Sequence, residues 1–281
     1  MRGVSLALEC QLMSKNGQSA ARRAAVPPPV LPRINYDVPR AIITFARDLP
    51  GGVQVPLHVH PRGQLLYSSR GTVTTSAEDG TWVAPPERAI WVPAGVPHST
   101  RHSVGSEVRN IFVRMDAAPG LPERCAVVQV SPLLRELLLA VMRLPPLYDE
   151  DGADGRLVRV LLDRVAALPD EPLHLPMPVN KRLRAVAAEL AERPGVSLAM
   201  AARQAAMSPR SFARHFLAET GLTFGAWQRQ ARLLRALELL GTGLGVGDVA
   251  VTLGYENTSA FIAMFRRTLG TTPARYFAGV K

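Results

Sequence analysis

Histidine and glutamine side chains in the N-terminal half have the spacing of a binding site. His58 and His60 lie two residues apart, Gln64 follows four residues after His60, and His98 comes after the proline- and glycine-rich turn 93–97. Side chains two apart on a strand point to the same face, so strand pairing could bring His98 beside the other two histidines. Convergent imidazoles bind divalent transition metals. The spacing therefore predicts a metal site made of His58, His60, Gln64 and His98.

The amide of Gln64 leaves two other interpretations open, because a neutral amide is a poorer ligand for a divalent cation than a carboxylate. In one, the histidines and Gln64 form a metal-free pocket that hydrogen-bonds a small-molecule effector. In the other, the imidazoles are purely structural. Tyr67 and Trp91 fall on or beside the same strands, so we expect them to wall this effector pocket, with ordinary core packing as the alternative.

Positive charge is concentrated at the C-terminal end. The whole chain of 281 residues has a net charge of +10, and residues 179–281 carry 14 basic against 6 acidic side chains. A basic domain attached to a nearly neutral one indicates a polyanionic partner, most often nucleic acid. The alternative is a solvated, arginine-rich surface.

The same basic region repeats itself at an offset of 49 residues. Each half has a helix of small residues, a tight turn with a capping residue, and a second helix with phenylalanine at positions i and i+4 that ends at glycine. This is the construction of a helix-turn-helix unit, although a duplicated structural bundle would show it too. The matched pairs are Ala201 and Ala250, Ala205 and Gly254, Ser208 and Asn257, Phe212 and Phe261, Phe216 and Phe265, Gly221 and Gly270, and Thr223 and Thr272.

The hydrophobic pattern of the elements that must position these side chains changes along the chain. Short apolar stretches between glycines and prolines predict antiparallel strands, whereas apolar spacing typical of helices begins at residue 133. We therefore expect an α+β multidomain chain, with an N-terminal β-barrel or jelly roll followed by an all-α domain with two helix-turn-helix units. The expected segments are a flexible tail (1–33), a sensor domain (34–120), a helical linker and dimerisation region (121–170) and a DNA-binding domain (179–281), joined by the proline-rich linker 169–178.

The C-terminal region closely resembles the DNA-binding domain of the AraC/XylS family, which carries two helix-turn-helix units. The resemblance rests on Ser208–Phe216 with Glu219-Thr220-Gly221, and on Asp248–Ala250, Leu253–Tyr255, Ser259–Phe261, Phe265–Arg267, Gly270–Pro273 and Tyr276. It implies that the second helix of each unit enters a DNA groove. Because Phe212 and Phe216 face inward, Arg210 and Arg214 face outward, where either guanidinium could bind guanine; an ion pair with Glu219 is the alternative for Arg214.

Further contacts follow on the two outward faces. Ser211 and His215 are expected to contact the DNA backbone. In the second unit, Ala260 and Ala263 fall where the resemblance implies polar side chains that read bases, so this helix is expected to position the domain more than to specify sequence. The expected contact residues there are Asn257, Thr258, Ser259, Arg266 and Arg267.

The N-terminal region resembles the cupin fold. Gly52, His58-x-His60, Gln64 and Gly71 follow its first motif, and Pro93-x-Gly95-x-x-His98 follows its second, over about fifty residues. The motif normally has glutamate at the position of Gln64. The resemblance therefore implies a cupin-type sensor domain, whose site could hold a divalent transition metal; no cofactor is certain from the sequence.

Together these features predict a one-component, sequence-specific transcription regulator rather than an enzyme. Its expected partners are double-stranded promoter DNA, a small-molecule effector, RNA polymerase and a second copy of the chain. No apolar run approaches the ~20 residues of a membrane span, and Cys10 and Cys125 form no disulfide framework, so we expect a cytoplasmic protein with no membrane partner. The alternatives are a cupin metalloenzyme with a helical appendage and a non-specific, nucleoid-type DNA binder.

Overall fold

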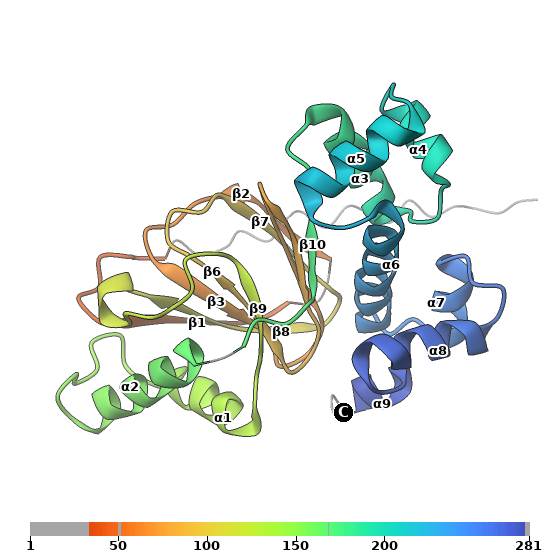
Figure 1. Cartoon of the computed structure of the whole chain (residues 1–281). Helices are drawn as coiled ribbons and strands as arrows, with labels where there is room; N and C mark the ends of the chain where they lie inside the picture. The colour runs from red at the N-terminus through yellow and green to blue at the C-terminus, as the bar shows by residue number, and fades with distance from the viewer. Residues whose placement is uncertain (1–33, 50–51, 168, 279–281) are drawn as a thin grey trace, which may run out of the picture. The chain divides into compact units, whose positions relative to one another are not determined.

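Two five-stranded antiparallel sheets form a sandwich in the N-terminal part of the chain (Figure 1). The computed structural model describes residues 34–49, 52–167 and 169–278; the expected tail, residues 1–33, lies outside them. The strand order is β1-β8-β3-β6-β9 in the first sheet and β10-β5-β4-β7-β2 in the second. The strands are β1 (Ile42–Leu49), β2 (Val53–His58), β3 (Gly63–Tyr67), β4 (Val73–Ala77), β5 (Gly80–Ala84), β6 (Arg88–Val92), β7 (His98–His102), β8 (Ser106–Val113), β9 (Ala126–Gln129) and β10 (His174–Pro176).

Both faces of the first sheet are apolar, because each packs against a different layer. Leu66, Ile90 and Val92 share one buried core with Val73 and Trp82 of the second sheet, which identifies their side as the interior of the sandwich. The alternate residues of the same strands belong to a second core with the helices α1 (Pro132–Val141) and α2 (Ala153–Ala166). The two helices cover the outer face of this sheet (Figure 1).

Two strands come from segments that we expected to be linking or helical. β9 extends the first sheet beside β6, and β10 pairs with β5 through His174 and Trp82, whose rings are stacked 4.6 Å apart. β10 is one of the two edge strands of its sheet, where a proline such as Pro176 is tolerated. The sandwich therefore includes part of the proline-rich segment 169–178.

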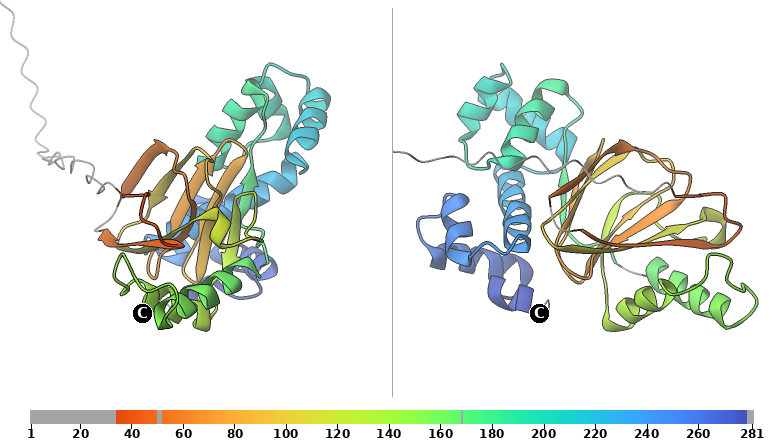
Figure 2. Two further views of the ribbon diagram at one scale, coloured as in Figure 1. Left: turned by 90° about the vertical axis from the view of Figure 1, so that its left-hand side faces the viewer. Right: turned by 180° about the vertical axis from the view of Figure 1, so that it is seen from behind.

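The remaining elements are helical, as the sequence predicted. They are α3 (Lys181–Glu192), α4 (Leu198–Gln204), α5 (Pro209–Thr220), α6 (Phe224–Gly241), α7 (Val246–Thr252), α8 (Thr258–Leu269) and α9 (Pro273–Ala278); a short 3₁₀ turn, Met115–Ala117, precedes β9. The long helix α6 runs between the pair α4 and α5 and the pair α7 and α8 (Figures 1 and 2). The prediction of a β-rich domain followed by an all-α domain is confirmed.

The two repeated units begin and end their second helices in the same way. Ser208 accepts a hydrogen bond from the Ser211 amide at 3.2 Å, and Asn257 accepts one from the Ala260 amide at 2.8 Å. Gly221 and Gly270 end the two helices with φ values of 70° and 75°, in the left-handed region that favours glycine. The phenylalanines of both units are fully buried: Phe212, Phe216, Phe261 and Phe265.

Candidate functional sites

Three histidines of the sandwich, His58, His60 and His98, converge at one end of the second sheet. β2 ends at His58, which pairs with His98 at the start of β7, and His60 follows in the connection to β3. The ring centroids lie 4.3 Å apart for His58 and His98, 5.0 Å for His60 and His98, and 5.9 Å for His58 and His60. One nitrogen of each ring lies within 4.8 Å of the others. The structure therefore brings together the three histidines that the sequence singled out.

Backbone carbonyls determine which ring nitrogen of each histidine carries the proton. The Nδ1 atoms lie 2.9 Å from the Pro56 oxygen for His58, 2.5 Å from the Arg62 oxygen for His60 and 2.9 Å from the Val96 oxygen for His98. A carbonyl can only accept, so each Nδ1 must donate. In a neutral imidazole the other nitrogen, Nε2, then presents a lone pair.

Gln64 of β3 lies against two of these lone pairs. Its side-chain amide is 3.0 Å from Nε2 of His60 and 3.3 Å from Nε2 of His98, both measured to the end assigned as oxygen. The glutamine and these two histidines are at least 96% buried. Burial lowers the pKa of His98 to about 4 and also lowers the pKa of His60. Both rings are therefore neutral at neutral pH.

A divalent cation at this cluster meets a donor set that fits only in part. Three imidazoles with Nδ1 bound to carbonyls are oriented as in many metal sites. The fourth group, however, is the uncharged amide of Gln64, and only the three histidines gather as potential ligands among the described residues. A divalent cation would then carry its full charge into a site where His60 and His98 are buried, without a carboxylate to compensate it.

Tyr67 and Trp91 do not join the histidine cluster. Both are buried in the second core, under α1 and α2, and the Trp91 indole donates to the Pro122 oxygen at 2.8 Å. Their positions along the strands explain this. Gln64 and Leu66 of β3 face the interior of the sandwich, so the alternate residue Tyr67 faces the helices. Trp91 pairs with Leu65 and therefore faces the helices too. The structure thus places the two aromatic residues predicted for the effector pocket on the opposite face of the first sheet.

Three interior polar residues were missed by the site prediction. Thr75 of β4, His102 of β7 and Asn110 of β8 are at most 5% exposed. Within the described ranges, Oγ1, Nδ1 and Oδ1 of these residues have no hydrogen-bond partner. Burial lowers the pKa of His102 to about 4, so its ring is neutral as well. Alternation along β7 gives a sequence signal for one of them, because His98 and His102 are four residues apart on one strand.

The first predicted DNA-contact helix, α5, presents its polar residues to solvent. Arg210, Arg214 and His215 are exposed, and Ser211 is half-buried at the first turn. In the described part of the chain, neither arginine forms an ion pair. Glu219, the alternative partner of Arg214, instead accepts a hydrogen bond from the Asn180 amide at 2.8 Å. Both guanidinium groups are therefore available to a partner.

The second helix, α8, exposes all five of its predicted contact residues, which are Asn257, Thr258, Ser259, Arg266 and Arg267. The oxygen of Asn257 already caps the helix at Ala260, so its amide nitrogen is the group left for a partner. Ser259, Arg266 and Arg267 line an open hollow of about 580 Å³ with Ile262 and Ala263. Positively charged groups therefore lie beside small and apolar ones on this face.

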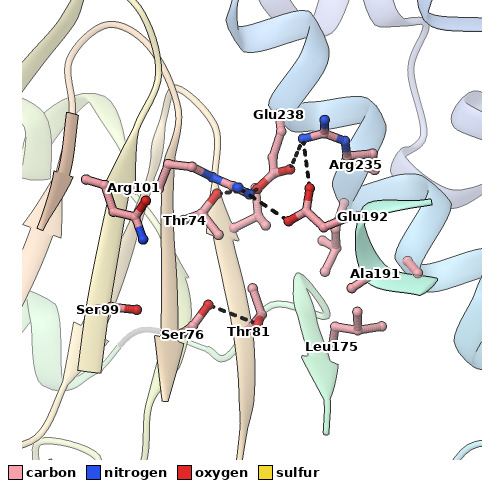
Figure 3. Close-up of a pocket in the computed structure, with 14 residues that line it drawn as sticks. Thr74, Ser76, Thr81, Ser99, Arg101, Leu175, Ala191, Glu192, Arg235 and Glu238 are labelled. Carbon is pink, nitrogen blue, oxygen red and sulfur yellow. Dashed lines mark hydrogen bonds and ion pairs between the residues drawn. The ribbon is translucent and has the colours of Figure 1, made fainter. Parts of the chain in front are cut away.

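An ion-pair network joins the second sheet to the helices α3 and α6. Arg101 of β7 binds Glu238 of α6 at 2.6 Å and Glu192 of α3 at 3.3 Å, and Thr74 of β4 donates to Glu238 at 2.6 Å (Figure 3). Arg235 lies 2.8 Å from the second oxygen of Glu238. Burial alone would raise the pKa of Glu238, but the charge of Arg101 and the hydrogen bonds outweigh it, and the pKa is lowered. These five residues, which we call the junction network, line a cavity of about 240 Å³.

Apolar packing continues across the same contact. Trp227 and Leu234 of α6 belong to one continuous core with Leu173, Leu175 and Val83 of the sandwich. The Trp227 indole donates to the Pro176 oxygen at 2.7 Å. The two regions are therefore joined by a shared core as well as by charges.

Comparison with protein-family models matches two successive parts of the chain, which overlap at residues 201–203. Residues 52–203 match the model of an AraC-like ligand-binding domain, and residues 201–279 match that of a helix-turn-helix domain. The transcriptional regulator NimR of Escherichia coli K12 is 37% identical over 225 residues, which cover 79% of this chain and 82% of NimR. No helix in the described ranges is long and apolar enough to cross a membrane.

Solved structures give two further similarities. The crystal structure of ToxT from Vibrio cholerae O395 aligns with 86% of this chain and 98% of its own, at 10% identity and a TM-score of 0.36. The DNA-binding domain of AdpA, solved in complex with a target DNA, aligns with 37% of this chain and 92% of its own. The identity is 32% and the TM-score 0.32.

Proposed function

This chain belongs to the AraC family of transcriptional regulators, and we propose that a small molecule bound between its two sheets controls how its helix-turn-helix units bind a promoter. The observation that carries the proposal is the two-sided role of β7. His98 and His102 face the interior of the sandwich, whereas Arg101 faces outward and binds Glu238 of α6. A change in the interior that moves β7 therefore moves a contact of the helix that joins the two units.

The DNA-binding step uses both units. Arg210 and Arg214 of α5 would contact base edges, since a guanidinium can bind guanine O6 and N7 together. Ser211 and His215 would contact the backbone nearby. On α8, the five exposed contact residues would hold the domain in register, mainly through phosphates.

Further partners complete the proposed role. We expect the regulator to act in the cytoplasm as a homodimer, paired through α1 and α2, and to meet RNA polymerase at the promoter. Leu133 of α1 and Val160 of α2 are 55% and 43% exposed, which supports an apolar contact there. An enzymatic role has less support, because the cluster of histidines lacks the carboxylate that a cupin metal centre normally uses.

Selection of genomic DNA by the purified full-length protein, at one stated salt concentration, tests the proposed function. Two reading helices in successive major-groove turns predict a discrete motif about two helical turns long. The regulated genes beside that motif would then supply effector candidates. Binding without sequence preference would instead favour the nucleoid-type alternative and overturn the proposal.

A further inference from the structure

We propose that the histidine cluster works without a metal ion, with the amide of Gln64 in the place of the cation, and that its effector is an uncharged molecule that donates hydrogen bonds. The first half of this inference concerns the cluster alone. The second half rests on the proposed function, because it assigns the chemical class of the effector.

The hydrogen bonds within the cluster support the metal-free arrangement. Nε2 of His60 and Nε2 of His98 both present lone pairs, because their Nδ1 protons are held by carbonyls at 2.5 and 2.9 Å. If the Gln64 atom at 3.0 Å from His60 and 3.3 Å from His98 were the amide oxygen, three acceptors would face one another in a buried site. No donor would lie between them, which is energetically unfavourable. The two ends of an amide have nearly the same shape, and the hydrogen-bond network decides their assignment. With the nitrogen of Gln64 facing the rings, its two hydrogens serve both histidines.

The identity of the residue at position 64 then has a chemical reason. A carboxylate here would present only acceptors to His60 and His98 and would need a cation between them. A glutamine supplies the two donors itself and leaves no net charge in the site. The departure from the cupin motif therefore replaces a metal-dependent arrangement by one that is complete with side chains alone.

The polar groups that lack a hydrogen-bond partner within the described ranges indicate the chemistry of the effector. Nε2 of His58 has no donor among the residues that the structure describes, and this half-buried residue lies at the edge strand β2. Farther inside, Thr75, His102 and Asn110 have polar atoms without partners in the described part of the chain, and Oδ1 of Asn110 can only accept. The Thr75 hydroxyl and Nδ1 of His102 can take either role, whereas an effector that satisfies Oδ1 of Asn110 must donate a hydrogen bond.

In the described part of the chain, no buried side chain offers a free permanent charge to an ionic effector. Of the buried side chains in the described ranges, only Arg62 carries a permanent charge. Its guanidinium already donates to the backbone oxygens of Tyr36, Val38 and Arg40. No free permanent charge therefore remains among the buried described residues to balance a charge on a ligand.

Titration of the full-length protein with Co²⁺ at neutral pH tests the inference, because Co²⁺ bound by histidines has a visible absorption. We expect the wild-type protein to show no stoichiometric absorption, whereas Gln64→Glu should bind Co²⁺ at least about tenfold more tightly, as expected for a restored ligand. Gln54→Glu adds the same charge to an exposed position of β2 and should behave as the wild type. Binding of one Co²⁺ by the wild type as tightly as by Gln64→Glu would overturn the proposal.

A second measurement needs no variant. Nitrogen-15 NMR of the imidazoles in the metal-free wild-type protein should show neutral rings protonated at Nδ1 for both His60 and His98. The Gln64 side-chain amide should show hydrogen bonds to their Nε2 atoms. Protonation at Nε2 of either ring would contradict the arrangement. Neither measurement involves DNA, so failure here and failure of the proposed function are distinguishable.

Discussion

Arg214 is the residue whose surroundings most directly support a base contact. It is exposed on α5, and it has no ion pair within the described ranges. A free guanidinium on a helix between two inward-facing phenylalanine positions can reach a base edge in the major groove. A base contact by Arg214 involves one side chain, so a single substitution can test it.

Substitution of Arg214 by alanine should weaken binding to the selected motif by about 1–3 kcal/mol and relax preference at one base position. Affinities for the motif and for a scrambled sequence at the same salt concentration measure both effects. Arg203→Ala is the matched control, because Arg203 is an exposed arginine on α4, the first helix of the same unit. An equal loss on both DNAs would identify Arg214 as a phosphate contact.

The residues of the histidine cluster could be predicted from sequence, whereas the residues that surround it could not. His58, His60 and His98 have spacing that only needs strand pairing to converge. Tyr67 and Trp91 were misplaced because both faces of the first sheet are apolar, so alternation gives no signal of which face is interior. The end of β2 and the connection to His60 also cannot be derived from a period of two, since the ladder shifts between Val55 and His58.

At the scale of elements, helix and strand ends determine how closely the two regions approach. α6 ends at Gly241, and a Cβ atom there would overlap Oγ1 of Thr72 and lie 2.8 Å from its Cβ. Thr72 precedes β4, the strand that also supplies Thr74 to the junction network. The absence of a side chain at Gly241 is therefore what lets the end of α6 reach the second sheet. The sequence could not indicate this contact, because glycine at a helix end is common for local reasons.

Gly241→Ala should lower the free energy of unfolding, although alanine is the better helix former by about 1 kcal/mol. The reason is the overlap with Thr72, which must be relieved by moving α6 or the start of β4. Gly225→Ala in the same helix is the control, because a Cβ atom there would lie 3.6 Å from the Arg229 guanidinium, an ordinary van der Waals contact. Denaturant unfolding should show that the free energy of unfolding falls for Gly241→Ala and rises for Gly225→Ala. Stabilisation by both would mean that the Thr72 contact yields easily.

At the scale of the whole molecule, sensing requires that the interior of the sandwich and the DNA-binding helices influence each other. The shared core and the junction network provide the physical path, since Arg101 on β7 is bound by Glu238 on α6 at 2.6 Å. Coupling between two sites is reciprocal for binding free energies. DNA bound at α5 and α8 must therefore affect β7 if an effector near β7 affects DNA, and this can be measured before the effector is identified.

Hydrogen exchange of the β7 amides, with and without the selected DNA, measures that coupling. Saturating DNA should change exchange in β7 of the wild type, and Glu238→Gln should abolish most of the change, because the amide keeps the shape of Glu238 but loses its charge. Glu189→Gln on α3 is the control, since Glu189 is exposed and outside the junction network. Each variant must bind DNA at the concentrations used. If the wild-type β7 amides exchange at the same rate with and without DNA, β7 does not transmit between the sites, and the signal must pass through the apolar contact of Trp227 and Leu234 instead.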